Sequence, residues 1–597
     1  MLRPSEREGI REAWDIHKKH TLSSSIIDKM VIRDNELAFI TQEDGEIPII
    51  ENYGYGLYYH DCRYLSGFHI RLMDVPPTQV LSSDERGFIS TLIVTNPEMK
   101  DCTGTVIAKE TLLGIMTTTI PGCIQQSHTI RNFNTFPVTL ELNFEFDADF
   151  ADMFTIRGIV PPTAGKVLPA RFDGKKLYLS YEGEDRLRRN TIIAFDPLPT
   201  KVEGKICTFE LNITSHGLQT INLEISVEEI KPGQEPERPV KTPDERINQI
   251  IGSHTAALEY CNNIPTSNNI FNSIMARSLA DLNMMRMNLN GDVFHAAGIP
   301  WYDTLFGRDS IISALQILPF DAELAKGTLL VNAKFQSNSS DDWRDQEPGK
   351  IAHELRRGEL ANLKLIPQTP YYGTVDATPL FLILLTEYVN WTGDIELVKL
   401  LENNVDRALE WIDVHANMEG NGFIYYAVKS PLGIYNHGWK DSPDSISRSD
   451  GTLAKQPIAV AEAQGYVYMA KKGLAPLFRR IGRKSDAARL EREAEELKER
   501  FNREFWMEDK QFFAQALDAD GVCDVISSNP AQCLWTEIID QRYAKCLVNR
   551  IFRDDMFTEW GIRTLSSKEK RYNPLGYHNG TVWPHDNAII TMGLRKY

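Results

Sequence analysis

Two hydrophobic periodicities divide this chain of 597 residues, and a proline-rich stretch separates them. Before about residue 230, apolar and polar residues alternate, as in residues 140–146, and this period of two is typical of strands with one buried face. Four prolines fall between Lys231 and Asp244, where proline removes ladder donors and stiffens a connection. We therefore predict a β domain at residues 1–230, a linker at 231–243 and a helical domain at 244–597.

The first domain is predicted to be a β-sandwich. Its short strand-like runs are separated by turn signals such as Asn96-Pro97 and Asp173-Gly174. Many such runs in succession are typical of two packed sheets.

The second domain is predicted to be built from helices joined by long loops. Leu490, Ala494, Leu497 and Phe501 fall on one helical face, and other segments repeat this pattern. Strand-like and helical runs do not alternate there, which argues against a barrel of parallel strands surrounded by helices.

Composition restricts the function. A formal net charge of −17 would repel nucleic acid, whereas a neutral substrate rich in hydroxyl groups would not be repelled. The 10 Trp and 21 Tyr suit a sugar binder, although aromatic residues mostly fill cores. The sequence has no phosphate loop, dinucleotide fingerprint or zinc-ligand spacing, so neither a cofactor nor a metal is predicted.

The cellular compartment is predicted from the cysteines and from the N-terminal residues. The eight cysteines form no CxxC pair and are too sparse for a disulfide framework, which favours reduced thiols and a cytoplasmic location. Residues 1–19 contain no apolar stretch suited to a signal peptide, and no run of 18 apolar residues occurs, so no membrane association is predicted.

Five loop segments of the helical domain combine aromatic residues with charged or amide groups. That pairing suits a sugar, which offers a flat apolar face and adjacent hydroxyls for bidentate hydrogen bonds. Any one of these segments could equally be a helix cap or a surface turn, but five in one domain indicate a carbohydrate site. The segments are residues 301–309, 347–350, 373–376, 438–442 and 577–587.

On these segments, residues from about 290 to 597 resemble the glucosidase domain of glycogen debranching enzymes, the amylo-α-1,6-glucosidases, and their bacterial and archaeal relatives. Residues from about 30 to 225 resemble the accompanying β-rich N-terminal domain, chiefly at 56–65 and 149–158. The resemblance implies an (α/α)6 barrel, the six-hairpin glycosidase fold, after the β-sandwich. It also implies an enzyme that hydrolyses α-1,6 branch linkages of glycogen-like glucans or oligosaccharides with inversion.

The resemblance also implies a general acid. Residues 374–377 and the apolar run after them are similar to the neutral-invertase segment that carries the acid, which indicates Asp376. Apolar flanks would raise its pKa and keep it protonated near neutral pH. The alternative is that Asp376 caps the helix that follows. Glu347 and Glu354 lie in a segment similar to the Glu-Pro-Gly-Lys loop of the family and are the runner-up acids.

The pair Arg308-Asp309 is similar to the pair that grips sugar hydroxyls in glucoamylases. A guanidinium offers a planar fork of donors, and a carboxylate accepts two hydroxyl protons. The alternative for Arg308-Asp309 is a structural ion pair at a helix start. For Glu462 and Gln464, capping or a place on a helix surface is as well supported as sugar binding. The predicted substrate-binding residues are Trp301, Asp303, Arg308, Asp309, Trp439, Lys440, Asp441, Glu462, Gln464, His578, Asn579, Trp583, His585 and Asp586.

An inverting glycosidase also needs a second carboxylate, about 6.5–9.5 Å from the acid. In bacterial relatives the candidate base follows the counterpart of residues 583–586 by some dozens of residues, and this sequence ends at Tyr597. We therefore expect a barrel that is truncated at its C-terminal end and lacks its base, with Glu559 a disfavoured substitute. The sequence leaves open whether the chain is a fragment or a natural short variant that uses another base or none. Two alternatives stay open: a catalytically impaired carbohydrate-binding protein, or a glycosidase of the same barrel with another oligosaccharide substrate.

Overall fold

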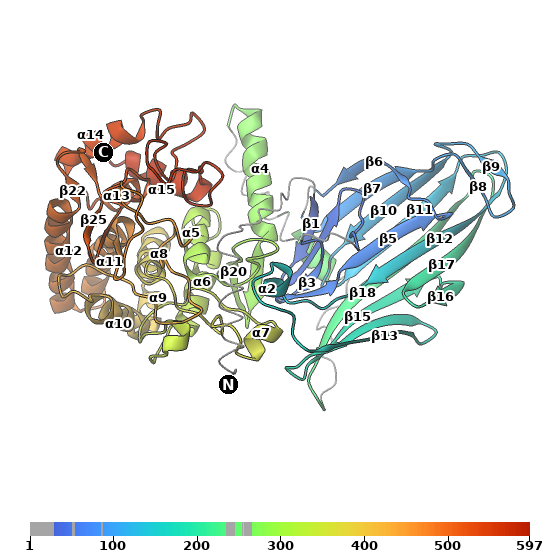
Figure 1. Cartoon of the computed structure of the whole chain (residues 1–597), viewed down its shortest axis with the longest axis horizontal. Coiled ribbons are helices and arrows are strands. Elements are labelled where there is room, and N and C mark those ends of the chain that lie inside the picture. The colour runs from blue at the N-terminus through green and yellow to red at the C-terminus, as the bar shows by residue number, and fades with distance from the viewer. Residues whose placement is uncertain (1–28, 50–53, 85–86, 234–244, 253–254, 256–265) are drawn as a thin grey trace.

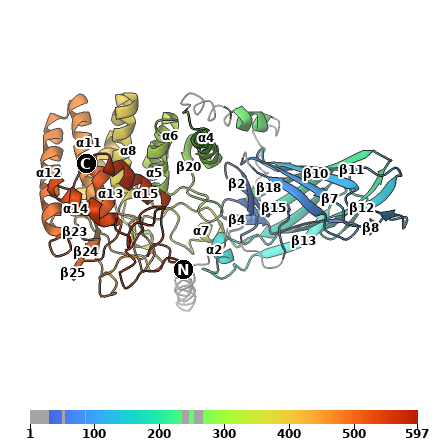
Figure 2. The same cartoon turned by 90° about the horizontal axis from the view of Figure 1, so that it is seen from above.

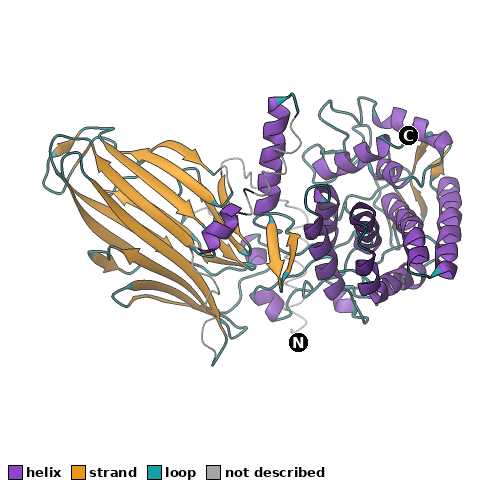
Figure 3. Cartoon of the chain, turned by 180° about the vertical axis from the view of Figure 1, so that it is seen from behind, coloured by secondary structure: helices purple, strands orange, loops and turns teal. Residues whose placement is uncertain are grey.

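The computed structural model describes residues 29–49, 54–84, 87–233, 245–252, 255 and 266–597, and its strands and helices gather at opposite ends (Figures 1 and 3). The predicted order, a β-rich domain followed by a helical domain, is confirmed. The linker predicted at 231–243 falls mostly outside these residues and stays a prediction. Residues 1–19, which are predicted to contain no signal peptide, also lie outside them. No helix in the described part is both long and apolar enough to cross a membrane.

Two antiparallel sheets pack face to face in the first domain. Their strands are β5 (Gly67–Leu72), β6 (Thr78–Ser83), β7 (Ile89–Thr95), β10 (Leu112–Thr119), β11 (Ile124–Asn132), β12 (Val138–Asp147), β13 (Lys166–Phe172), β14 (Lys176–Glu182), β15 (Arg188–Asp196), β16 (Lys201–Glu203), β17 (Ile206–Ile213) and β18 (Leu218–Ile230). The larger sheet has the order β13-β14-β15-β18-β11-β10-β7-β6, and the smaller has β16-β17-β12-β5. Within the described strands both sheets keep free edges, so the domain is an open sandwich.

The apolar face of β12 packs in the core of this sandwich. The leucine and phenylalanine side chains of residues 140–146 are buried, while their polar neighbours are partly exposed. Across the gap between the sheets, the ring of Phe195 in β15 lies 6.2 Å from that of Phe146 and 5.7 Å from that of Phe209. The period of two in the sequence therefore places one face of each strand against the opposite sheet.

A third antiparallel sheet lies at the end of the β domain that faces the helices (Figure 1). It consists of β1 (Lys29–Asp34), β2 (Leu37–Gln42), β3 (Gly56–Tyr59) and β4 (Cys62–Leu65), in that order. Its loops and strands supply most of the charged groups that bind the helical domain.

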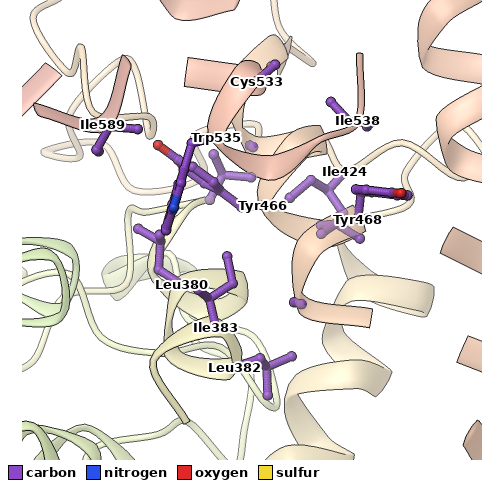
Figure 4. Packing of buried hydrophobic residues seen from close by; sticks show 14 of the residues in the cluster. Leu380, Leu382, Ile383, Ile424, Tyr466, Tyr468, Cys533, Trp535, Ile538 and Ile589 are labelled. Carbon is purple, nitrogen blue, oxygen red and sulfur yellow. The ribbon is translucent and has the colours of Figure 1, made fainter. Parts of the chain in front are cut away.

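Helices α8 (Ala377–Thr392), α11 (Ala461–Arg480), α13 (Asn529–Thr536) and α15 (Pro584–Leu594) share one apolar core (Figure 4). The run Leu380–Leu385 in α8 is entirely buried, as expected for a helix that is apolar on all sides. Helix α12 (Lys484–Glu504) packs against α11 and buries the predicted stripe of Leu490, Ala494, Leu497 and Phe501. The other helices are α4 (Asn269–Met284), α5 (Gly307–Ile317), α6 (Ala322–Lys334), α7 (Glu359–Asn362), α9 (Ile395–Leu400), α10 (Glu402–Glu410) and α14 (Gln541–Ile551).

A buried arginine joins the two domains. The guanidinium of Arg356 is 2.8 Å from the carboxylate of Asp61 in the β domain, and it also binds Glu354 and the carbonyl of Trp301. The second oxygen of Asp61 accepts from the backbone N–H of Arg357 at 2.7 Å. Because the Arg356 side chain is only 2% exposed, its charge depends on these partners.

A second buried arginine and a short apolar contact complete this interface. Arg33 of β1 binds both oxygens of Asp303 at 2.9 and 3.1 Å, as well as the carbonyls of Met284 and Arg286. Helix α2 (Met153–Ile156), which follows the sandwich strand β12, packs through Met153 and Phe154 on α7, and the two helices are neighbours in Figures 1 and 2.

Replacing Asp61 should therefore destabilise the protein strongly. Asp61→Ala removes one of two counter-ions from a buried guanidinium, and such a loss costs about 3–5 kcal/mol in free energy of unfolding. Denaturant or thermal unfolding measures this change. The control is Glu203→Ala, because the pair of Glu203 with Lys201 is exposed and should contribute little. Equal losses in the two variants would contradict the structural role of Asp61.

Candidate active site

The site is built on the first turn of α5, which begins at a close contact between two backbones. A Cβ atom at Gly307 would lie 2.0 Å from the carbonyl oxygen of Ala352, so glycine is required there. The N–H of Gly307 donates to the carbonyl of His353 at 2.9 Å. This packing fixes the position of the next two residues, Arg308 and Asp309.

Arg308 is the centre of the cluster. Its guanidinium is 3.3 Å from a carboxylate oxygen of Asp376 and 3.3 Å from one of Asp441, and it donates to the carbonyl of Gly438 at 3.0 Å. Burial opposes the charged form, but Asp376, Asp309 and Asp441 outweigh it and hold the pKa of Arg308 above its ordinary value. One permanent cation thus joins three segments that are far apart in the sequence.

Asp376 is fully buried at the base of the cluster. One of its oxygens accepts from the Thr374 hydroxyl at 2.7 Å, and the other accepts from Arg308. Although Asp376 directly precedes α8, its side chain makes no capping hydrogen bond to that helix. Since both oxygens are engaged, the carboxylate is placed to hold Arg308.

Asp441 differs from Asp376 in being partly exposed. Its side chain is 28% exposed, and one oxygen is bound by Arg308. Burial raises the pKa of Asp441 to about 6; Arg308 opposes this shift, while the charges of Asp309 and Asp376 add to it. The result is an accessible carboxyl group that keeps its proton well above the usual range of an aspartate.

Asp309 has an unused acceptor. Its Oδ2 atom is buried without a hydrogen-bond partner among the described residues, and it lies 3.8 Å from Nε of Arg308. Burial raises the pKa of this carboxyl group as well. An unsatisfied buried acceptor is costly, and a hydroxyl group of a ligand would satisfy it.

Aromatic rings from two loops lie next to the cluster. The ring of Trp439 packs edge-on at 4.8 Å from His585, 5.4 Å from His578 and 5.8 Å from Trp583. Burial lowers the pKa of both histidines, so both rings are neutral near pH 7. Tyr577, which is 40% exposed, extends this group of rings toward solvent. Apolar ring faces beside carboxylates suit a pyranose.

Lys440, Glu462 and Asp586 form a buried polar layer that adjoins the cluster. The Lys440 ammonium donates to the carbonyl of Thr564 at 2.6 Å, and Asn529 donates to both oxygens of Glu462 at 3.0 and 3.1 Å. Burial lowers the pKa of Lys440 and raises those of Glu462 and Asp586. Glu462 and Asp586 bind residues of α13, while Lys440 ties residues 438–442 to Thr564.

Two further predicted residues also bind protein groups. Gln464 accepts from the N–H of Ile424 and donates to its carbonyl, both at 2.9 Å. Asn579 donates to Asp444 at 2.8 Å. Both are placed to hold loops at the edge of the cluster.

Glu347 is held by cations away from the Arg308 cluster. It accepts from Trp411 Nε1 and from the Lys429 ammonium, each at 2.9 Å. Although burial alone would raise its pKa, Lys350, Lys429 and the Trp411 hydrogen bond lower it to about 2. Glu347 is therefore ionised near neutral pH and has no proton to donate.

Three other predicted site residues lie at the domain interface. Glu354 and the carbonyl of Trp301 bind Arg356, and the carboxylate of Asp303 binds Arg33. Burial raises the pKa of Glu354, but its carboxylate faces the β domain and not Arg308. The structure therefore does not bring these three residues into the Arg308 cluster.

Sequence reasoning missed groups that act through backbone atoms or small side chains. The carbonyl of Gly438 and the hydroxyl of Thr374 hold Arg308 and Asp376, yet neither residue type signals such a role. Tyr302, between two predicted residues, packs its ring 5.7 Å from that of Phe306 at the start of α5, and it contributes to raising the pKa of Tyr577. Among the described residues no cluster of His, Cys, Asp or Glu could hold a metal ion.

Residues 292–597 match the family described as the mannosylglycerate hydrolase MGH1-like glycoside hydrolase domain. Residues 32–224 match the N-terminal domain of some glycogen debranching enzymes. No curated protein matches the sequence.

Three solved structures illustrate the likeness of fold. A bacterial glucoamylase in complex with acarbose is 10% identical, with a TM-score of 0.55 over 93% of this chain and 83% of its own. A protein assigned as a kojibiose phosphorylase from the human microbiome is 9% identical, with a TM-score of 0.50 over 95% and 81%. A GH63 mannosylglycerate hydrolase from Thermus thermophilus, in complex with Tris, is 14% identical, with a TM-score of 0.40 over 58% and 87%.

The first two of these structures agree with the predicted fold, a β-rich domain followed by a domain of the (α/α)6 glycosidase kind. The family match covers the segments that carry Arg308, Asp376, Asp441 and the aromatic loop 577–587. The chain therefore belongs to the mannosylglycerate hydrolase MGH1-like family of glycoside hydrolases, and its catalytic domain follows a β domain of the kind found in some glycogen debranching enzymes.

Proposed function

We propose that the protein is an inverting, exo-acting glucosidase that removes α-1,6-linked glucose from branched glucans or short oligosaccharides. The observation that carries the chemistry is Asp441, a partly exposed carboxyl group with its pKa raised to about 6 beside a fixed guanidinium. The α-1,6 linkage is supported by the resemblance to debranching enzymes and by the match of residues 32–224 to their N-terminal domain. The cytoplasmic location predicted from the cysteines is part of the same proposal.

Asp441 fits the general acid better than the other candidates. A general acid must reach the glycosidic oxygen and still carry a proton near the working pH. Asp376 is fully enclosed, Glu347 is ionised, and Glu354 is bound by Arg356 at the domain interface. We therefore move the acid role from Asp376, predicted from sequence, to Asp441, and propose that Asp376 positions Arg308.

In the proposed reaction, Asp441 donates its proton to the glycosidic oxygen as the bond between that oxygen and the anomeric carbon breaks. A water molecule attacks the anomeric carbon from the opposite face and gives its proton to a second carboxylate. Arg308 and the free oxygen of Asp309 bind hydroxyls of the glucose that carries the anomeric carbon, and the partly exposed rings of Trp583 and Tyr577 offer apolar surface beside it. The tests of Asp441 and Asp309 measure binding as well as hydrolysis.

The family name suggests mannosylglycerate as another substrate. Its glycerate group is an anion, which would need a free cation in the site. Arg308 already faces three carboxylates, and Lys440 is fully buried against a carbonyl. Within the Arg308 cluster this balance of charge supports a neutral sugar. It does not restrict a leaving group that lies outside the cluster, so a panel of both substrates distinguishes the two.

Asp441→Asn should abolish hydrolysis of isomaltose while leaving glucose affinity within a few-fold of wild type. Asparagine can still bind Arg308 but has no acidic proton, and loss of a general acid costs about 10²–10⁴-fold in rate. Asp376→Asn should instead weaken glucose binding, because it removes a charge that holds Arg308. Rates, calorimetric binding and the anomer released, followed by NMR, measure these effects. If Asp376→Asn loses hydrolysis with binding intact and Asp441→Asn stays active, the acid is Asp376.

The reaction should also lose rate as pH rises. Since the acid acts in its protonated form and the pKa of Asp441 is raised to about 6, kcat/KM should fall on the alkaline side of about pH 6. A profile of kcat/KM from pH 4 to 9 tests this, with unfolding followed over the same range. A rate that stays constant to pH 8 would remove Asp441 from the acid role.

Asp309→Ala should weaken glucose binding by roughly ten- to a hundredfold, because a hydrogen bond to a charged group contributes about 1.5–3 kcal/mol. Isothermal calorimetry with glucose measures the change. Asp406→Ala is the control, since Asp406 is a half-exposed acidic residue of α10 that pairs with Arg483. Unchanged glucose affinity in Asp309→Ala would exclude Asp309 from the sugar site.

A further inference from the structure

The β domain places one arginine beside the catalytic loops. Asp152 caps helix α2 by accepting from the N–H of Phe154 at 2.9 Å, and Met153 and Phe154 pack on Leu360 and Ala361 of α7. Figures 1 and 2 both show α2 next to α7, where the two domains meet. Arg157 ends this helix, so its backbone is fixed against the helical domain.

Arg157 is bound differently from the other arginines of the interface. Arg33, Arg356 and Arg357 each bind a carboxylate. The guanidinium of Arg157 instead lies over two rings, 5.9 Å from the centroid of Trp301 and 5.7 Å from that of Tyr302. No hydrogen-bond acceptor within the described ranges holds it, and the residue is half-buried. Its N–H donors are therefore available to a ligand.

Tyr302 connects Arg157 to the Arg308 cluster. Its ring lies 5.7 Å from that of Phe306, which directly precedes α5 and Arg308, and burial, Tyr302 and Asp441 together raise the pKa of Tyr577. The ring of Tyr577 packs at 5.0 Å from Trp583. Arg157 thus contacts Tyr302, whose neighbour Phe306 leads directly into the turn that carries Arg308.

We propose that Arg157 of the β domain binds the leaving-group sugar of the substrate and so determines which aglycone the enzyme accepts. This inference rests on the proposed function. An acid must face the glycosidic oxygen, so the leaving group extends from Asp441 toward solvent, where the exposed ring of Tyr577 lies beside Trp583. A guanidinium offers a planar fork that matches adjacent hydroxyls, and the two rings under Arg157 hold this fork in place.

The alternative role for Arg157 is a structural counter-charge, because its field acts on the buried Glu354. The two roles predict different results. A structural role would lower the melting temperature and weaken every ligand, whereas a leaving-group role affects only ligands that carry a second sugar.

The experiment compares glucose with isomaltose, used as binding probes with the Asp441→Asn protein so that isomaltose is not consumed. Arg157→Ala in that background should weaken isomaltose binding by roughly ten- to a hundredfold and leave glucose affinity unchanged. Arg157→Lys keeps the charge but loses the planar fork, so its affinity for isomaltose should lie between those of the Arg157 and Arg157→Ala proteins. The control is Arg171→Ala, since Arg171 lies over Tyr178 on a sandwich strand, 4.3 Å from the ring, in the same kind of contact.

Equal weakening of glucose and isomaltose, or no change in either, would overturn the proposal, and a fall in melting temperature with equal weakening would identify the structural role. The proposed function fails separately if glucose does not bind the starting protein or if Asp309→Ala leaves glucose binding intact. If glucose binding depends on Asp309 but Arg157→Ala changes neither glucose nor isomaltose affinity, only the leaving-group role of Arg157 is wrong.

Discussion

One buried guanidinium organises the catalytic half of this protein. Arg308 cannot lose its charge, so the fold must surround it with acceptors, and it does so with Asp376, Asp441 and the carbonyl of Gly438. Those groups begin α8 or lie in the loop at 438–442, which Lys440 fastens to Thr564. The position of Asp441, the proposed acid, therefore follows from the need of Arg308 for acceptors.

The same arrangement explains why two aspartates on one arginine behave differently. Asp376 has both oxygens occupied and no access to solvent, so it serves as a fixed counter-ion. Asp441 shares the cation but keeps an exposed edge, and burial together with neighbouring negative charge holds its proton. A site with more carboxylates than cations thus creates an acid without any special residue.

The sequence predicted the elements better than it predicted the partners of their side chains. The alternation of apolar and polar residues in β12 predicts a strand with one buried face, and the continuous apolar run of α8 predicts a helix buried on all sides. Both patterns can be read from the local sequence. In Trp301-Tyr302-Asp303, however, Asp303 binds Arg33 in the other domain while Tyr302 packs on Phe306 at the start of α5. Asp376 and Asp441 could not be ranked either, since exposure depends on loops that meet only in the folded protein.

The buried charges between the domains restrict how this architecture can be rearranged. Arg33 and Arg356 each have their counter-ion across the interface, so neither half carries a neutral, self-sufficient surface there. A catalytic domain joined to a foreign partner would keep Arg356 with only one of its two counter-ions and Asp303 without its cation, and buried charge that is not compensated is costly. Recombination should therefore move the two halves as one unit, and a sequence change at Asp61 or Arg33 should be accompanied by a compensating change in the other half.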